Sequence, residues 1–146
     1  MAKHDYEQLY RRLIDEVFNQ GRMEVADELV APHAVERQRG GMGDGPQGPQ
    51  RTATVLRSAF PNFSLTIQDL VVDGDKVWAR QRGGGTNTGS FFGHPPTGKT
   101  AYIEVFDVVR FEDGLMVEHW GVPDQLGMLA ALGLVVLPGR PAPAAV

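Results

Sequence analysis

Hydrophobic residues near the N-terminus recur every three or four positions, the spacing that places side chains on one face of an α-helix. The positions concerned are Tyr6, Leu9, Tyr10, Leu13, Ile14, Val17 and Phe18. Residues 19–21, Asn-Gln-Gly, tolerate the left-handed backbone of a helix C-terminus and therefore end this predicted helix. A shorter helix is predicted over residues 23–29, ending before Pro32, and a third over residues 51–60, ending at Pro61.

After Pro61 the period of the hydrophobic positions changes to two, as in a β-strand with one buried face. Phe63, Leu65 and Ile67 alternate with polar residues, and Asp73-Gly74 predicts a tight turn. The elements predicted after this turn are a second strand over 76–82, a broken strand after the glycines at 83–85, a long strand over 100–112, a last strand over 115–121 and a short helix over 124–132.

Three helices, a meandering antiparallel sheet and a closing helix predict an α+β domain with the helices on one side of a curved sheet. No strand–helix–strand alternation is present, so a Rossmann-type dinucleotide site is not expected. We expect one domain over residues 1–133 and a Pro/Ala-rich tail over 134–146, whose apolar residues 134–137 pack on the surface or on a partner. The glycine-rich residues 38–49 are a predicted loop, either a flap over a pocket or a solvated connection.

Composition and charge narrow the possible partners. A net charge of −4 over 146 residues, without a run of basic residues, argues against nucleic acid. No stretch approaches the roughly 18 apolar residues that span a bilayer, and the N-terminus lacks an apolar signal core, so a cytoplasmic protein outside the membrane is expected. The chain has no cysteine, and His33 and His94 stand in predicted loops without a spaced partner, so no metal site is expected.

Residues 93–100 match the phosphate-binding pattern G-x-x-x-x-G-K-[ST] letter for letter. In that motif, successive backbone N–H groups surround the phosphates at the N-terminus of a helix. Here Pro95 and Pro96 remove two of those donors, and residues 101–106 are β-branched, aromatic and alternating, which is typical of a strand. We therefore interpret the segment as a Pro-Pro turn followed by a strand.

The last predicted hairpin places an acid and a histidine on one otherwise apolar face. If Glu112-Asp113-Gly114 forms a three-residue loop with Gly114 left-handed, Asp107 pairs directly with His119 and the two side chains can hydrogen-bond. In a pocket, Asp107 would fix the imidazole tautomer and His119 would move protons near neutral pH. The alternatives are a pair that only satisfies itself in the core, or a two-residue Asp113-Gly114 turn that puts the two side chains on opposite faces.

The other face of this hairpin is too apolar to face water, so we expect a homodimer interface there. It carries Phe106, Val108, Met116 and Trp120, with Arg110 and Glu118 expected to pair diagonally.

Further residues are candidates for the pocket. Asp124 follows Pro123 and precedes a helix, so we expect an N-cap, with a pocket carboxylate as the alternative. The candidate pocket residues are Val105, Val109, Val117, Trp78 and Tyr10, with Trp78 and Tyr10 expected either in the core or in the pocket wall.

Three stretches resemble the SnoaL-like polyketide cyclase family of the NTF2-like superfamily. They are Gly85-Thr86-Asn87-Thr88-Gly89 through Gly93-His94-Pro95-Pro96-Thr97-Gly98-Lys99, then Arg110-Phe111-Glu112-Asp113-Gly114, and Val117-Glu118-His119-Trp120 continuing to Asp124 and Leu132-Gly133. The resemblance covers about residues 5–133. It implies an NTF2-like (cystatin-like) cone with an enclosed pocket, often dimeric, that closes polyketide rings by intramolecular aldol condensation without metal or cofactor.

The chain departs from this family at two positions. In the aldol cyclases the position of Gly121 holds the acid–base aspartate and the position of Asp107 holds a histidine, whereas His119 is retained. The resemblance leaves open whether Asp107 and His119 have taken over the acid–base role or whether the reaction differs.

We hypothesise a cofactor-independent cyclase or isomerase acting on a small, apolar, oxygenated, polyketide-like carbonyl compound. His119 would abstract or relay the proton, and Asp107 would orient it. The alternatives on the same fold are an epoxide or lactone hydrolase, a hydroxylase, and a non-catalytic small-molecule binding or dimerisation module.

Overall fold

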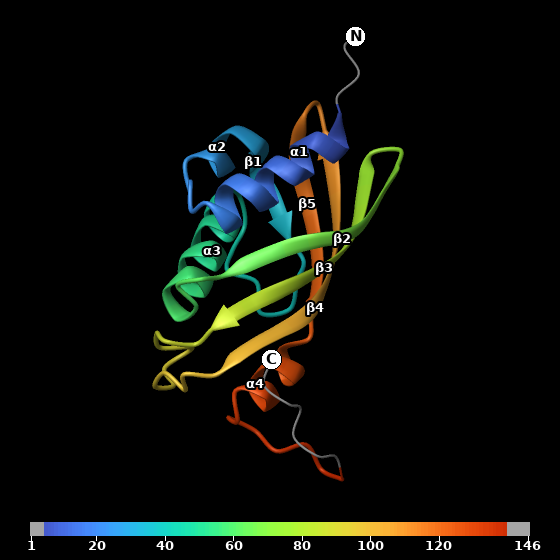
Figure 1. Cartoon of the computed structure of the whole chain (residues 1–146). Helices are drawn as coiled ribbons and strands as arrows, with labels where there is room; N and C mark the ends of the chain where they lie inside the picture. The colour runs from blue at the N-terminus through green and yellow to red at the C-terminus, as the bar shows by residue number, and fades with distance from the viewer. Residues whose placement is uncertain (1–4, 140–146) are drawn as a thin grey trace.

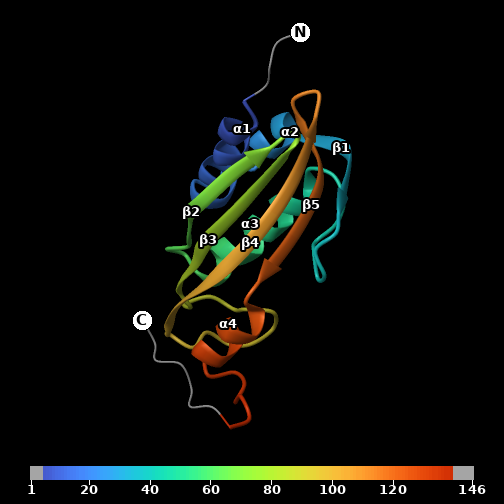
Figure 2. The same cartoon turned by 90° about the vertical axis from the view of Figure 1, so that its right-hand side faces the viewer.

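Five strands form one curved sheet in the computed structural model, which describes residues 5–139. The order across the sheet is β1-β5-β4-β3-β2. The pairs β2–β3, β3–β4 and β4–β5 are antiparallel, and β1 is parallel to β5. The strands are β1 (Val30–Glu36), β2 (Ser64–Asp73), β3 (Lys76–Thr86), β4 (Thr100–Glu112) and β5 (Leu115–Pro123). The helices α1 to α3 cover one face of this sheet, and α4 lies beyond one end of it (Figures 1 and 2). This arrangement confirms the predicted α+β class.

The helices are α1 (Tyr6–Arg12), η1 (Leu13–Asn19), α2 (Val25–Leu29), α3 (Gln47–Ala59) and α4 (Gln125–Ala131). The first predicted helix is therefore continuous in space but changes to a π-helix at Leu13. Hydrogen bonds there join residues five positions apart, such as Gln20 N to Asp15 O (2.9 Å). Its apolar stripe remains the buried face, and Ile14 and Val17 pack in the same core as Val77 and Val109 of the sheet. Burial of each such side chain contributes about 1.5–3 kcal/mol.

The strand β1 was not predicted from the sequence. Its residues show no regular alternation of buried and exposed positions, and Pro32 lies inside it. An edge strand tolerates a proline because one of its sides needs no ladder hydrogen bonds. The predicted helix end before Pro32 is correct, but the chain then continues as the edge of the sheet. The loop predicted over 38–49 is shorter than expected, because α3 already begins at Gln47.

The strand β3 runs through the glycines at 83–85, where an interruption was predicted. At Gly84 the missing side chain allows other backbone to approach closely. A Cβ atom on Gly84 would lie 1.9 Å from the carbonyl oxygen of Ala101 and 2.8 Å from the Cα of Tyr102, both on the neighbouring strand β4. Gly84 therefore preserves the β3–β4 pairing.

Replacing Gly84 with alanine is expected to destabilise the protein by about 2–3 kcal/mol, because the new methyl group meets backbone that cannot move without separating β3 from β4. Urea unfolding followed by far-ultraviolet circular dichroism measures this change. Lys76→Ala in the same strand is the control and should change stability by less than about 0.5 kcal/mol. Equal effects of the two substitutions would contradict the close-approach explanation.

The turn between β4 and β5 differs from the predicted one. Asp113 (φ 51°) and Gly114 (φ 82°) both have left-handed backbone, and Glu112 pairs with Leu115. These features define a two-residue turn, not the predicted three-residue loop. Alone, such a turn would place the expected acid and histidine on opposite faces of the sheet.

A β-bulge in β5 restores the alternation. Phe111 pairs with Met116, but Arg110 pairs with Glu118, so Val117 has no partner on β4 and every later residue is shifted by one position. Met116 and Val117 are consequently both buried, each only 5% exposed. Met116 thus does not belong to the outer face of the hairpin, where the sequence had placed it.

The resulting register places the acid and the histidine on the same inner face as diagonal neighbours. Asp107 lies opposite Gly121, and Val109 lies opposite His119. The predicted direct pairing of Asp107 with His119 is wrong by two residues, yet the two side chains still point the same way.

The outer face of the sheet carries an apolar row that the helices do not cover. Trp78 and Phe106 are 51% and 53% exposed, and Val122 is 71% exposed. Trp78 had been expected in the pocket wall, but it pairs with Val108 on the outer face. The dimer through Phe106, Val108 and Trp120 stays a prediction, now without Met116.

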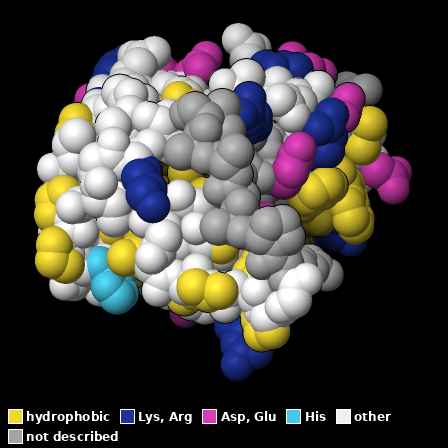
Figure 3. All heavy atoms as spheres, turned by 60° about the horizontal axis from the view of Figure 1, so that its bottom comes forward, with side chains coloured by type: hydrophobic (Ala, Val, Ile, Leu, Met, Phe, Trp, Pro, Cys, Tyr) yellow, Lys and Arg dark blue, Asp and Glu magenta, His cyan; other side chains and the backbone are white. Residues whose placement is uncertain are grey.

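Arg110 and Glu118 form the polar part of this outer face. They pair as an ion pair, as expected, although they lie directly opposite one another and not diagonally. The Arg110 Nε donates to Glu118 at 3.0 Å, and Arg37 also contacts that carboxylate. Seen from the end where α4 lies, hydrophobic side chains reach the surface in several separate places, with Lys and Arg side chains among them (Figure 3).

The segment that resembles a phosphate-binding loop connects β3 to β4 and is not followed by a helix. Buried Asn87 holds it, because its Oδ1 accepts hydrogen bonds from the backbone N (2.9 Å) and the hydroxyl (3.0 Å) of Thr97. β4 begins at Thr100, as the strand prediction required.

None of the helices in residues 5–139 is long and apolar enough to cross a membrane. Of the predicted tail, Leu134 packs against the core and Val136 is 88% exposed. Residues 1–4 and 140–146, and the expectations that fall on them, lie outside the described range.

Candidate active site

A cavity of about 500 Å³ lies between the helices and the inner face of the sheet. This volume falls in the usual range of small-molecule pockets. Most of its lining is apolar, including Phe18, Leu56, Phe60 and Ile103. Five polar side chains line it together in one region: Tyr10, Glu36, Gln38, Asp107 and His119. Among the described residues, this group holds both carboxylates that line the cavity.

Asp107 accepts three hydrogen bonds from three different elements. Its Oδ2 accepts from the Tyr10 hydroxyl and from the Gln81 Nε2, each at 2.8 Å, and its Oδ1 lies 2.9 Å from the Nε2 of His119. Burial alone would raise the pKa of the Asp107 carboxyl, but the hydrogen bond and charge of His119 and the two further donors outweigh burial and lower it. Asp107 is therefore an anion at neutral pH.

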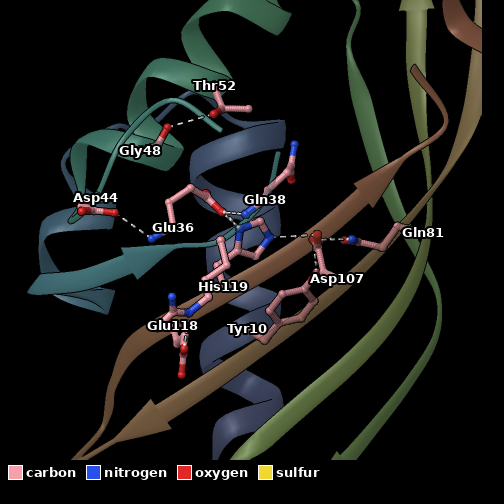
Figure 4. A network of polar contacts seen from close by, with 11 residues as sticks. Tyr10, Glu36, Gln38, Asp44, Gly48, Thr52, Gln81, Asp107, Glu118 and His119 are labelled. Atoms are coloured by element: carbon pink, nitrogen blue, oxygen red, sulfur yellow. Dashed lines mark hydrogen bonds and ion pairs between the residues drawn. The ribbon is translucent and has the colours of Figure 1, made fainter. Parts of the chain in front are cut away.

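The opposite nitrogen of the His119 ring contacts a second carboxylate. The Nδ1 lies 2.7 Å and 3.0 Å from the two oxygens of Glu36, so Glu36, His119 and Asp107 form a row (Figure 4). A neutral imidazole has one N–H, whereas both nitrogens here face carboxylates, which favours the doubly protonated ring. Burial would lower the pKa of His119, but the hydrogen bonds and charges of Asp107 and Glu36 raise it to about 10.

The end of β1 is hydrogen-bonded to β5 beside His119, and this pairing positions the Glu36 side chain. Glu36 pairs with His119 in the sheet, and the Arg37 N donates to the His119 carbonyl at 2.8 Å. The Glu36 N donates to Asp44, and the Glu36 side chain accepts from the Gln38 N, each at 2.8 Å. Sequence analysis missed Glu36 because it missed β1, and no local motif marks this position.

Tyr10 and Gln81 support the row from behind Asp107. Burial, followed by the Asp107 charge, raises the pKa of Tyr10 well above its usual value of 10.0, so its hydroxyl stays neutral and keeps donating. Gln81 is fully buried, and within residues 5–139 its Oε1 is a buried atom without a hydrogen-bond partner.

The row Glu36–His119–Asp107 has a net charge of −1, because it contains two carboxylates and one imidazolium.

The other predicted pocket residues divide into three groups. Tyr10, Val105 and Val109 line the cavity. Val117 is buried in the core but is outside the set of lining residues. Asp124 is the N-cap of α4, accepting from the Gly127 N at 2.9 Å, which confirms the first of its two predicted roles.

Gly121, where the resemblance implied an aspartate, leaves no space for a side chain. A Cβ atom there would lie 2.1 Å from the Gln38 Oε1, and 2.9 Å from both the Asp107 Oδ1 and the His119 Cε1. Gln38, from the segment after β1, therefore occupies the volume above Gly121. No sequence signal marks this exchange, because residues 38 and 121 are far apart in the chain.

The row of ionisable groups links two carboxylates through one imidazole ring. Within the described range, no three histidine or carboxylate side chains gather in a way that could hold a metal ion. In the row itself the two carboxylates lie on opposite sides of the His119 ring. Glu36 contacts the Nδ1, and Asp107 contacts the Nε2.

Comparison with known proteins gives consistent results for sequence and for structure. A family model described as SnoaL-like polyketide cyclase matches residues 8–132. Aklanonic acid methyl ester cyclase DnrD of Streptomyces peucetius is 27% identical over 132 residues, which cover 86% of this chain and 88% of that protein.

Two solved structures of similar length superpose over most of the chain. TsrD from Streptomyces laurentii has a TM-score of 0.81 and 28% identity, covering 92% of this chain and 99% of that one. IdmH from Streptomyces antibioticus has a TM-score of 0.78 and 34% identity, covering 89% and 99%.

Proposed function

Because this chain belongs to the SnoaL-like polyketide cyclase family, we propose that it closes a ring in, or isomerises, a neutral polyketide-like carbonyl compound by proton transfer alone. The observation that carries this proposal is the row Glu36–His119–Asp107 on the wall of a largely apolar cavity. A carbonyl compound needs a base at carbon and an acid at oxygen, and this row contains both kinds of group.

The ionisation of the row suggests the role of each residue. The sequence analysis assigned proton abstraction to His119, but a ring whose pKa is raised to about 10 already carries its proton near pH 7. We therefore assign the base to a carboxylate. Asp107 already accepts from three donors, which weakens it as a base. Within residues 5–139, the Glu36 side chain accepts only from His119 and the Gln38 N.

In the proposed ring closure, Glu36 removes a proton from the carbon next to a carbonyl group. That carbon and the carbonyl group together become an enolate. The enolate carbon forms a bond to a second carbonyl carbon of the same molecule, and the oxygen of that second carbonyl takes a proton from His119. Glu36 then returns its proton to His119, which balances the cycle without any other reactant. Asp107 holds the imidazolium in place, and proton transfer of this kind supplies about 10²–10⁴ in rate.

The charge of the cavity supports a neutral substrate. The polar group has a net charge of −1, and no lysine or arginine is among the cavity-lining residues of the described chain. A free carboxylate would therefore enter against repulsion, whereas an ester would not. The relative DnrD is named for acting on a methyl ester, so aklanonic acid methyl ester is the probe that we propose.

Mass spectrometry of the product tests the reaction type. We expect a product with the mass of the probe, or one water lighter; a gain of water or of an oxygen atom would contradict ring closure and point to hydrolysis or hydroxylation. Glu36→Gln should lower kcat by about 10²–10⁴ while the probe still binds. The exposed Glu28→Gln is the matched control, and equal rates in both variants would remove Glu36 from the mechanism.

A further inference from the structure

We infer that Gln38 donates the hydrogen bond that holds the reacting oxygen of the substrate, an inference that rests on the proposed function. The first step in the argument is a count of donors near the row. Both ring nitrogens of His119 face carboxylates, and the Tyr10 hydroxyl and the Gln81 amide donate to Asp107. Each of these donors already has a partner in the protein when the substrate arrives.

The Gln38 side chain is the exception among the five polar residues that line this region. It is partly buried, and its amide has no hydrogen-bond partner within residues 5–139, although its backbone N and O are both bonded, to Glu36 and to the Gly41 N. Its side chain extends beside the His119 ring (Figure 4). A partly buried amide without a partner costs free energy unless water or a ligand satisfies it.

The position of this amide relates it to the proton-transfer row. The Gln38 Oε1, the Asp107 Oδ1 and the His119 Cε1 all lie within 3 Å of the point where Gly121 would carry a Cβ. Because Oε1 is directed at Gly121, the Nε2 of the same amide is turned away from the sheet. Because Gln38 lines the cavity together with the row, a substrate oxygen bound to this Nε2 lies in the same cavity as the imidazolium.

The absence of a side chain at position 121 makes this arrangement possible. Any larger residue there would displace the Gln38 oxygen and change where its NH₂ group is directed. Gln38 thus supplies a neutral donor where the group already has a net negative charge. A donor aimed at an oxygen that gains charge during enolisation stabilises the transition state, and loss of one such donor costs about 10²–10³ in kcat.

Two substitutions of similar length separate donation from packing. Gln38→Met keeps the volume but removes the donor, so kcat/KM for aklanonic acid methyl ester should fall about 10²–10³-fold with unchanged thermal stability. Gln38→Glu should be equally slow at pH 8, where the new carboxylate cannot donate, and should recover part of the rate as the pH falls and the carboxyl gains a proton. The exposed Gln47→Met is the control.

The outcomes distinguish this inference from the function on which it depends. A wild-type protein that converts the probe while Gln38→Met is equally fast would overturn the role of Gln38 only. A Gln38→Glu variant whose rate relative to Gln38→Met does not rise at low pH would also overturn it, because a purely structural glutamine predicts no such rescue. A wild-type protein that neither binds nor converts the probe would overturn both proposals.

Discussion

Replacing His119 with alanine is expected to cost about 3–5 kcal/mol of stability at pH 8, because Glu36 and Asp107 would remain buried without the cation between them. Turnover should fall by at least about 10²-fold, since the proton donor is lost. The loss of stability should shrink towards pH 5, because one of the two carboxylates then takes up a proton and the repulsion disappears.

Urea unfolding at pH 5 and pH 8 measures this difference. His33→Ala, an exposed histidine of β1, is the control and should change stability little at either pH. The double variant His119→Ala with Glu36→Gln should regain part of the loss at pH 8, because one of the two facing charges is gone. A loss of stability independent of pH would mean that only packing had been removed.

The second large effect concerns the charge of the histidine. Asp107→Asn is expected to lower the pKa of His119 below its value of about 10, because the hydrogen bond and charge of Asp107 contribute to raising it. The change should be tolerated structurally. The Gln81 amide can rotate so that its unpartnered Oε1 accepts from the NH₂ group that the substitution introduces.

The direction of the pH dependence follows from these shifts. A raised pKa of His119 stabilises the folded state fully below the ordinary value of 6.5, and this stabilisation is lost as the pH rises towards about 10. Asp107, whose pKa is lowered, contributes stability above its ordinary value of 3.8 that is lost as the pH falls. In Asp107→Asn the alkaline loss should therefore be smaller and should be complete at lower pH.

Nuclear magnetic resonance titration of the imidazole Cε1–H signal reports the pKa of His119 directly, and urea unfolding from pH 6 to pH 10 reports its effect on stability. Asp69→Asn, which removes an exposed carboxylate on β2, should leave both unchanged. An unaltered titration in Asp107→Asn would show that Glu36 alone holds the charge on the ring.

The sequence predicted the fold class and named two of the three residues in the row Glu36–His119–Asp107. Helical and strand periodicities of the hydrophobic residues were sufficient to predict an element where one of its faces is buried, as in α1 and β4. They failed for β1, whose burial pattern is irregular, and for β3, whose glycines are a packing requirement and not a break. The missing strand had the largest consequence, because it carries Glu36 and leads into Gln38.

The Asp107–His119 contact was predicted from an incorrect register. The turn is one residue shorter than expected and the bulge adds one residue later, so two deviations restore the facing of His119. Hydrophobicity at positions 115–117 offered no means of locating that bulge, since Leu115, Met116 and Val117 are all apolar. Contacts between distant segments, such as Gln38 with Gly121, have no local pattern at all.

The unpaired Val117 also indicates how such a protein could lose or gain its chemistry during evolution. Removal of this one residue would turn every later side chain of β5 over, sending the imidazole to the solvent side and tryptophan to the interior, with all reactive residues still encoded. Where a relative keeps the histidine but has a hairpin that is longer or shorter by one residue, the face of the strand on which the histidine lies should therefore be established before a shared activity is assumed.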